Sequence, residues 1–250
     1  IARWPLLPRL WRWRAHVLEL TLFIGAYLVY RFTRGVGPSD LEAAALANAA
    51  QVIGLERSLG FLWEPGWQSW AIDTSKALVG FFNWVYIITY WPIILVTALA
   101  AYVFDRRRYY YYRSVVMLSL AGALLVFALF PLAPPRRAPE YFVDTIRVFG
   151  PSSYGSPGMS AYYNAYAAMP SLHFAWTAVL AVLFLSTLPG WLKVFGIFYP
   201  ALTFFAITIT GNHYILDAVA GGLLAAAAFL VMEIGIRRRL LLAWWWRRPR

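Results

Sequence analysis

The chain has 250 residues, of which 61% are hydrophobic and only 13% are charged. Soluble domains usually carry about 25% charged residues, so this composition excludes a soluble globular protein and indicates one polytopic membrane domain. The formal net charge of +11 lies in short arginine clusters between apolar runs, which favours membrane orientation over nucleic-acid binding, and the lack of cysteine excludes disulfides and thiolate chemistry.

The N-terminal segment is basic and aromatic. Residues 1–16 alternate arginine and tryptophan, which is typical of the headgroup layer at a cytoplasmic membrane face. We expect no cleavable signal peptide. A first membrane span is predicted at about 17–30, and Gly35 and Pro38 end it.

Residues 40–60 predict an amphipathic helix that lies in the membrane interface. Apolar residues recur there at steps of three and four, and polar residues such as Glu42 and Glu56 are interspersed. A tryptophan-rich turn is predicted to follow, around Trp63, Trp67 and Trp70.

Five more apolar segments predict five more spans. They cover about 83–104, 115–130, 171–188, 194–210 and 215–236. A polar, proline-rich loop occupies 131–169, and a basic tail occupies 237–250. The expected fold class is therefore all-α: a polytopic membrane protein in which residues 17–236 form a six-transmembrane-helix bundle, with the interfacial helix and an outer-face loop.

Six spans place both termini on one side of the membrane. Most of the 22 Lys and Arg residues lie in segments on that side, so we expect both termini to be cytoplasmic in a multi-pass protein of the cell membrane. The 131–169 loop and the starts of the fourth and sixth spans then lie at the extracytoplasmic face.

Two histidines lie beside the ends of predicted spans. His173 follows Pro170 and Ser171 at a predicted helix start, where free amide groups bind anions. His213 precedes Asp217 by four residues, so both lie on one helix face. An aspartate on one imidazole nitrogen makes the other a better nucleophile or base. The pattern predicts phosphoryl or acyl transfer, and phosphoryl transfer is favoured.

Three other interpretations of these residues stay open. His213 could be an interfacial histidine with Asp217 as a helix-packing residue, His173 could be structural, or the histidines could bind a metal ion together with Asp217. The last is disfavoured because the chain has no HExxH motif and no cysteine-rich spacing.

The stretch PLAPPRRAP, residues 131–139, brings Arg136 and Arg137 to the same predicted membrane face. Guanidinium groups suit phosphate binding, although either arginine could instead extend to the lipid headgroups. Four further polar residues are candidates for contact with a lipid headgroup: Asp144, Asn164, Tyr166 and Asn212.

These stretches together resemble the type 2 phosphatidic acid phosphatase superfamily. Its second motif, Pro-Ser-x-His, is matched by Pro170, Ser171 and His173. Its third motif ends in Gly-x-His-x-x-x-Asp, matched by Gly211, His213 and Asp217.

The chain departs from the other parts of the family pattern. The first motif, Lys-x6-Arg-Pro, is matched only loosely, because Arg137 is followed by Ala138 and no lysine lies seven residues upstream. Ala206 and Ile207 stand where the third motif opens with Ser-Arg. With these departures, the chain resembles the inositol phosphorylceramide synthase (inositolphosphotransferase) branch and its bacterial relatives. The segments that carry this resemblance are NAYAAMPSLHFAW, APPRR, NHYILDAVAG and the helix that contains Glu56.

The resemblance implies a metal-independent enzyme without a cofactor. In it, His213 attacks phosphorus to form a phosphohistidine, Asp217 orients His213, and His173 protonates the leaving alcohol and then activates the acceptor. Arg136 or Arg137, with the amides near Ser171, would hold the phosphoryl oxygens.

The missing cationic residues favour a phosphodiester donor. A phosphodiester carries one negative charge, whereas a monoester carries close to two. We therefore expect a headgroup phosphotransferase of the inositol-phosphate kind, whose partners are a membrane lipid and a polar alcohol or water. A lipid phosphate phosphatase acting on phosphatidate or polyprenyl phosphate is the alternative, and a non-catalytic lipid-binding or transport protein is the alternative from another class.

Overall fold

The computed structural model describes residues 7–33, 41–138, 140–150 and 166–246. The chain forms two units, residues 1–38 and 39–250. The described part of the first unit is a single helix, α1 (Leu7–Thr33), which contains the predicted span at 17–30.

The described part of the second unit is built from helices. They are α2 (Leu41–Ser58), α3 (Glu64–Thr74), α4 (Lys76–Trp84), α5 (Tyr90–Phe104), α6 (Arg106–Leu129), α7 (Thr145–Phe149), α9 (Leu172–Thr187), α10 (Val194–Ile209) and α11 (Ile215–Trp246). Three short helical segments join them: the π-helix η1 (Val85–Thr89) and the 3-10 helices η2 (Pro135–Arg137) and η3 (Gly190–Lys193). Within these ranges, β pairing is limited to an isolated parallel bridge between Leu132 and Ala167, which agrees with the all-α prediction.

Four described helical segments are long and apolar enough to cross a membrane: Lys76–Phe104, Arg106–Leu129, Gly190–Ile209 and Ile215–Arg238. The protein is therefore membrane-embedded. Helix α9 is apolar but has 16 residues, so its length of about 24 Å falls short of the ~30 Å hydrocarbon layer. Helix α1 is not among the four, and the predicted count of six spans stays a prediction.

The segment before the second predicted span differs from the prediction. Residues 64–74 form helix α3 rather than a turn, and a proline in the first turn favours this helix start. Trp67 packs against Phe204 and Phe205 of α10 at ring-centroid distances of 6.0 and 5.7 Å. Trp67 and Trp70 thus lie in a helix, with Trp67 on its packed face, and the predicted turn was wrong.

The predicted helix at 40–60 is present as α2, and one of its faces is buried. That face consists of Ala45, Ala49, Val52, Ile53 and Glu56. It packs against Leu132, Ala133 and Phe142 of the loop that follows α6, and against Tyr214. Two hydrogen bonds join helix and loop, from the Asn48 side chain to the Pro131 carbonyl (2.8 Å) and from the Ala133 amide to the Ala45 carbonyl (3.1 Å). Helix α2 therefore supports the loop that carries Arg136 and Arg137.

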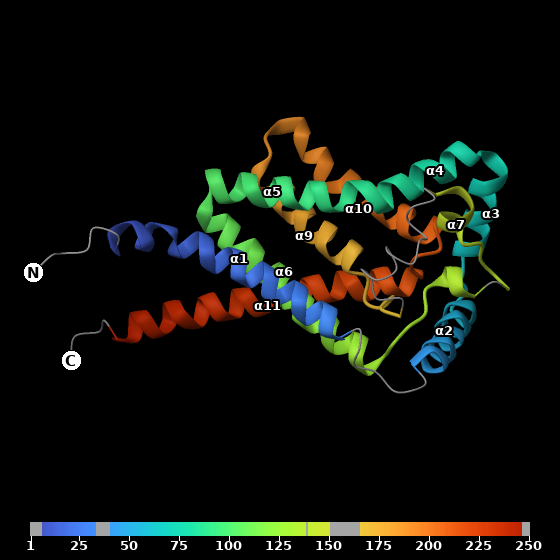
Figure 1. The fold of residues 1–250 in the computed structure, drawn as a ribbon, viewed down its shortest axis with the longest axis horizontal. Coiled ribbons are helices and arrows are strands. Elements are labelled where there is room, and N and C mark those ends of the chain that lie inside the picture. The colour runs from blue at the N-terminus through green and yellow to red at the C-terminus, as the bar shows by residue number, and fades with distance from the viewer. Residues whose placement is uncertain (1–6, 34–40, 139, 151–165, 247–250) are drawn as a thin grey trace, which may run out of the picture. The chain divides into compact units, whose positions relative to one another are not determined.

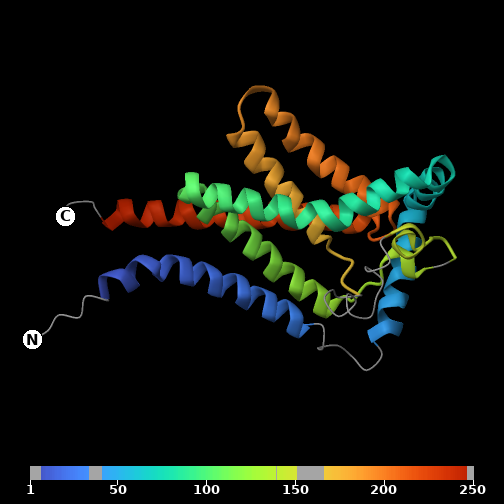
Figure 2. The same cartoon turned by 45° about the horizontal axis from the view of Figure 1, so that its top comes forward.

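Within the second unit, α5, α6, α9, α10 and α11 run alongside one another, and α2, α3, α4 and α7 gather near one end of them (Figures 1 and 2). Helix α9 packs closely on α10, α11 and α6. Helix α10 ends, and α9 and α11 begin, at the end where the smaller helices gather (Figure 1). This topology brings the histidine motifs and the arginine loop to one end of the helices.

Candidate active site

The turn between α10 and α11 places His213. Gly211 has a φ of +69°, a conformation that glycine adopts without steric cost. The turn folds back onto α10, because the amides of Asn212 and His213 both donate to the Ile207 carbonyl at 3.0 Å. The Arg136 amide donates to the Gly211 carbonyl at 2.8 Å. This main-chain contact fastens the arginine loop to the histidine turn.

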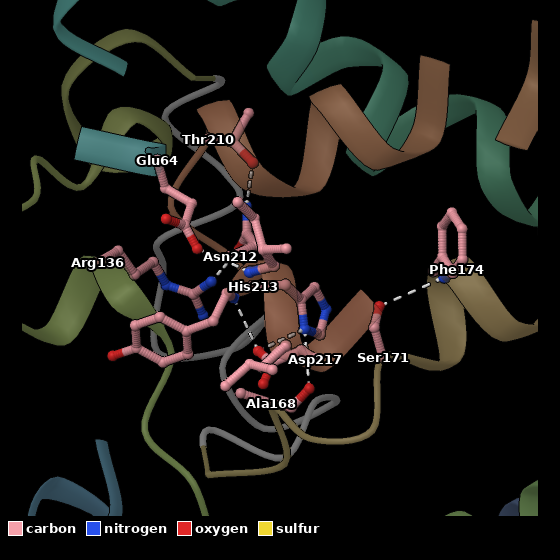
Figure 3. Close-up of polar contacts among 12 residues, drawn as sticks. Glu64, Arg136, Ala168, Ser171, Phe174, Thr210, Asn212, His213 and Asp217 are labelled. Atoms are coloured by element: carbon pink, nitrogen blue, oxygen red, sulfur yellow. Dashed lines mark hydrogen bonds and ion pairs between the residues drawn. The ribbon is translucent and has the colours of Figure 1, made fainter. Parts of the chain in front are cut away.

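His213 is buried, and two acceptors hold one of its ring nitrogens. Its Nδ1 atom lies 2.8 Å from the carbonyl oxygen of Ala168 and 3.3 Å from Oδ2 of Asp217 (Figure 3). Because both neighbours accept, Nδ1 carries the proton, and Nε2 keeps its lone pair. Asp217 is itself held, since its Oδ2 accepts from the Tyr214 amide at 2.9 Å. The arrangement orients the imidazole as a nucleophile or base at Nε2.

His173 lies in the first turn of α9, next to the capping residue Ser171. The buried Ser171 hydroxyl accepts from the Phe174 amide at 3.3 Å (Figure 3). The first main-chain hydrogen bond of the helix runs from Ala175 to Ser171, so the amides of Leu172 and His173 precede the helical ladder. Amides at such a position can bind an anion.

A main-chain contact joins the two histidine motifs. The Ser171 amide donates to the Asp217 carbonyl at 2.9 Å. The close approach requires Gly221, because a Cβ atom there would collide with the Ser171 carbonyl oxygen. As a result, the ring centroids of His173 and His213 lie 5.9 Å apart.

The His173 ring lies against two tyrosines of the segment that contains the π-helix. Its centroid is 4.5 Å from that of Tyr86 and 4.1 Å from that of Tyr90, with interplanar angles of 29° and 33°. The Tyr90 hydroxyl donates to the Leu172 carbonyl at 3.1 Å. Sequence reasoning missed both tyrosines, because a π-helical turn changes which residues of an apolar helix share a face.

The two arginines point to different partners. Arg136 donates from Nη1 to the Oδ1 atom of Asn212, the residue before His213 (Figure 3). Arg137 donates to the Tyr166 hydroxyl at 2.9 Å and lies 3.4 Å from Glu42. Arg137 is exposed, whereas Arg136 is partly buried. The structure therefore brings Arg136, and not Arg137, to the turn that carries His213.

The four residues predicted to contact a lipid headgroup also lie in different surroundings. Asn212 is buried and donates to the Thr210 hydroxyl at 2.6 Å. Tyr166 contacts Arg137, as described above. Asp144 caps the short helix α7 by accepting from the Arg147 amide at 3.0 Å. Asn164 lies outside the described residues.

Buried polar side chains of α3 and α4 hold the loop against the end of α10. Gln68 donates to the carbonyls of Ile209 (3.0 Å) and Val143 (3.1 Å), and Asn83 donates to that of Thr145 (3.0 Å). Sequence reasoning did not single out Gln68 or Asn83, although a polar residue within an apolar helix was a usable signal.

A small cavity adjoins His173. Its volume is about 10 Å³, which is room for about one water molecule. Ala206 and Ile207, which stand where the resembled motif has Ser-Arg, line it together with Tyr199 and Thr203 of the same helix. Apolar side chains therefore line the cavity at the positions where the resembled family's third motif has Ser-Arg. In the described residues, no cluster of three or more His, Asp and Glu side chains could hold a metal ion.

Comparison with known families gives a match over most of the chain. The model of the PAP2 superfamily matches residues 50–231, which include the second half of α2, both histidine motifs and the arginine loop. Comparisons with curated proteins and with solved structures gave no match.

Proposed function

Because the chain belongs to the PAP2 superfamily, whose members are phosphatases and phosphotransferases of lipid-type substrates, we propose that it transfers a phosphoryl group from a membrane lipid phosphoester through a phosphohistidine at His213. The observation that carries the proposal is the pair of acceptors at Nδ1, the Ala168 carbonyl and Asp217. They leave Nε2 free to attack, and the ring centroid of His173 lies 5.9 Å from that of His213.

The first chemical step breaks the ester bond of the donor. Nε2 of His213 forms a bond to phosphorus, and the bond between phosphorus and the leaving oxygen breaks. His173 gives its proton to that oxygen, so an alcohol leaves. As the imidazole of His213 becomes cationic, Asp217 and the Ala168 carbonyl stabilise the proton at Nδ1.

The second step returns both histidines to their starting state. His173 takes the proton of an acceptor hydroxyl, whose oxygen attacks phosphorus as the P–N bond breaks. With water as the acceptor, the net reaction is hydrolysis, and with a polar alcohol it is transfer. Arg136 and the amides that precede the α9 ladder are the proposed donors to the phosphoryl oxygens.

Within this reaction class we favour a headgroup phosphotransferase of the inositol-phosphate kind over a lipid phosphate phosphatase. Arg136 contacts Asn212, the residue before His213, whereas Arg137 contacts Tyr166 and Glu42. Ala206 and Ile207 supply no second cation beside His173. One guanidinium group matches the single charge of a phosphodiester better than the nearly double charge of a monoester.

The activity assay that tests the proposal uses the purified protein in detergent micelles. Phosphatidic acid represents the monoesters and phosphatidylinositol the diesters, each with and without an added polyol. Free phosphate and new phosphodiesters are followed together. A new diester that depends on the polyol supports transfer, whereas phosphate release that the polyol does not change supports the phosphatase alternative.

His213→Ala separates the enzyme from the non-catalytic alternative. We expect this variant to lose activity by a factor of at least about 10³, because it removes the nucleophile. His16→Ala in α1 is the matched control and should retain activity. Labelled phosphate that stays on the wild-type protein in alkali but is released in acid would identify the phosphohistidine. Full activity of His213→Ala on both lipids would contradict the mechanism.

A further inference from the structure

The N-terminal end of α11 is held by three carboxyl groups that are 0% exposed. They come from three different helices and accept from consecutive main-chain amides. Tyr214 donates to Asp217 (2.9 Å), Ile215 donates to Glu64 (2.7 Å), and Leu216 donates to Glu56 (2.8 Å). Asp217 already has a place in the proposed reaction, whereas Glu56 on α2 and Glu64 on α3 do not.

Glu56 and Glu64 are near enough to interact with each other, and both are buried from solvent. The Oε2 atom of each has no hydrogen-bond partner in the described part of the chain. The loop residues that pack on the same face of α2 are apolar: Leu132, Ala133 and Phe142. Two ionised carboxylates in such surroundings would repel each other and would lose their hydration.

One proton on the pair removes this conflict. Burial, and then the neighbouring Glu64 and Asp217, raise the pKa of Glu56 to about 9, although the Leu216 amide acts in the opposite direction. Tyr214 is a further titratable group here, and burial with the nearby carboxyl groups raises its pKa as well. Glu56 is therefore neutral at physiological pH.

We propose that Glu56 and Glu64 share one proton and act as positioning residues for His213 in the phosphoryl transfer proposed above, on which this inference rests. The amides that they hold belong to the residues two and three positions after His213. Fixing these amides fixes the first turn of α11. Asp217 in that turn then stays within reach of Nδ1.

The net charge of the Glu56–Glu64 pair affects the first turn of α11, in addition to the hydrogen bonds that the pair accepts. A single negative charge complements the positive end of the α11 dipole. Loss of the shared proton would place two negative charges beside Asp217 and loosen the turn. The wild-type enzyme should therefore lose activity as the pH rises through about 9.

Three substitutions test the proposal in the detergent assay with phosphatidic acid and phosphatidylinositol. Glu56→Gln keeps an acceptor for Leu216 and mimics the neutral acid, so we expect its kcat at neutral pH to stay within about threefold of wild type. Glu56→Ala and Glu64→Ala remove an acceptor, and each should lower kcat at least about tenfold with little change in KM. Glu233→Gln, at an exposed position near the middle of α11, is the control and should behave as wild type.

The pH profile separates positioning by a shared proton from a merely structural role. Glu56→Gln has no proton to lose, so its activity should extend to higher pH than that of the wild type. The proposal is overturned if Glu56→Gln is as defective as Glu56→Ala at neutral pH. It is also overturned if Glu56→Gln and wild type lose activity at the same alkaline pH.

Thermal unfolding gives a readout that needs no turnover. In the folded state Glu56 keeps its proton up to about pH 9, whereas the ordinary glutamate pKa is 4.5. The stability that this proton contributes is therefore complete below about pH 4.5 and is lost as the pH rises toward about 9. Glu56→Gln lacks this dependence, so its Tm relative to wild type should increase over that range. A constant difference would contradict the shared proton even if no lipid substrate were found, whereas inactivity of the wild type alone would contradict the proposed function.

Discussion

At the residue scale, the neighbouring residues Arg136 and Arg137 have different partners, and only Arg136 contacts the turn that carries His213. Arg136 contacts Asn212 through its side chain and Gly211 through its amide, so it belongs to the turn that carries His213. Arg137 contacts Tyr166 and Glu42 at the exposed edge of the loop. The 3-10 turn η2 directs the consecutive side chains apart.

Arg136→Ala and Arg137→Ala form a matched pair that tests this difference. Removing a preorganised donor to a reacting phosphoryl group costs about 10²–10³ in kcat, and we expect Arg136→Ala to lose that much. Arg137→Ala removes exposed contacts, so it should cost less than about tenfold. Steady-state kinetics on the preferred lipid compares them. A larger loss for Arg137→Ala would assign phosphate binding to the other arginine.

Sequence reasoning could relate His213 to Asp217, because they are four residues apart on one helix face, and could single out His173 from the neighbouring Pro170 and Ser171. It could not choose between Arg136 and Arg137, since the choice depends on how a three-residue turn packs against α10 and α11. Glu64 was out of reach for the same reason. Its partner, the Ile215 amide, lies 151 residues away.

At the element scale, the contact between α9 and α11 sets the spacing of the two histidines. Gly221 permits it, since any side chain there meets the Ser171 carbonyl. Ser171 in turn both caps α9 and donates to Asp217. The pair of helices therefore acts as one support for both imidazoles.

Gly221→Ala tests that support. The added methyl group forces the helices apart, and overpacking of this kind costs about 1–3 kcal/mol, so we expect a lower Tm together with reduced kcat. Gly235→Ala on the same helix is the control, because a Cβ there meets nothing within 4 Å and alanine favours a helix. Thermal unfolding and the lipid assay compare them. A Gly221→Ala variant as active and stable as Gly235→Ala would show that the close approach is not needed.

At this scale, helices could be predicted only where the sequence shows a long apolar segment or a regular apolar periodicity. Long apolar segments gave the approximate positions of α5, α6, α10 and α11, because composition alone identifies them. The sequence predicts a turn where α3 forms, because the tryptophans there follow no regular apolar face: Trp67 packs on α10, whereas Trp70 is exposed. The π-helix η1 has no recognisable sequence pattern, although it brings Tyr86 and Tyr90 to His173.

At the scale of the whole molecule, the membrane orientation is the main expectation that can be tested. We propose that both termini face the cytoplasm and that the site lies at the extracytoplasmic face. Helix α6 runs from the arginine-rich segment 106–108 to the start of the loop that carries Arg136. Residues 108 and 147 should therefore lie on opposite sides of the membrane.

Labelling of single cysteines checks the orientation, and the chain has no native cysteine to interfere. Arg147→Cys on α7 should react with a membrane-impermeant thiol reagent in intact cells. Arg108→Cys should react only after the membrane is permeabilised. The opposite pattern would reverse the orientation, and labelling of both in intact cells would contradict the assignment of α6 as a span.

The two acceptors at Nδ1 of His213 differ in how a mutation can affect them. One is the side chain of Asp217, which a single codon change can remove, and the other is the main-chain carbonyl of residue 168. That carbonyl is present whatever amino acid is encoded there, so the buried position selects only for a small side chain. Point mutation can therefore abolish only one of the two restraints on the ring. A single mutation therefore leaves at least one acceptor that favours the Nδ1-protonated tautomer of His213. The spacing of the two histidines has no such second support, because it depends on Gly221.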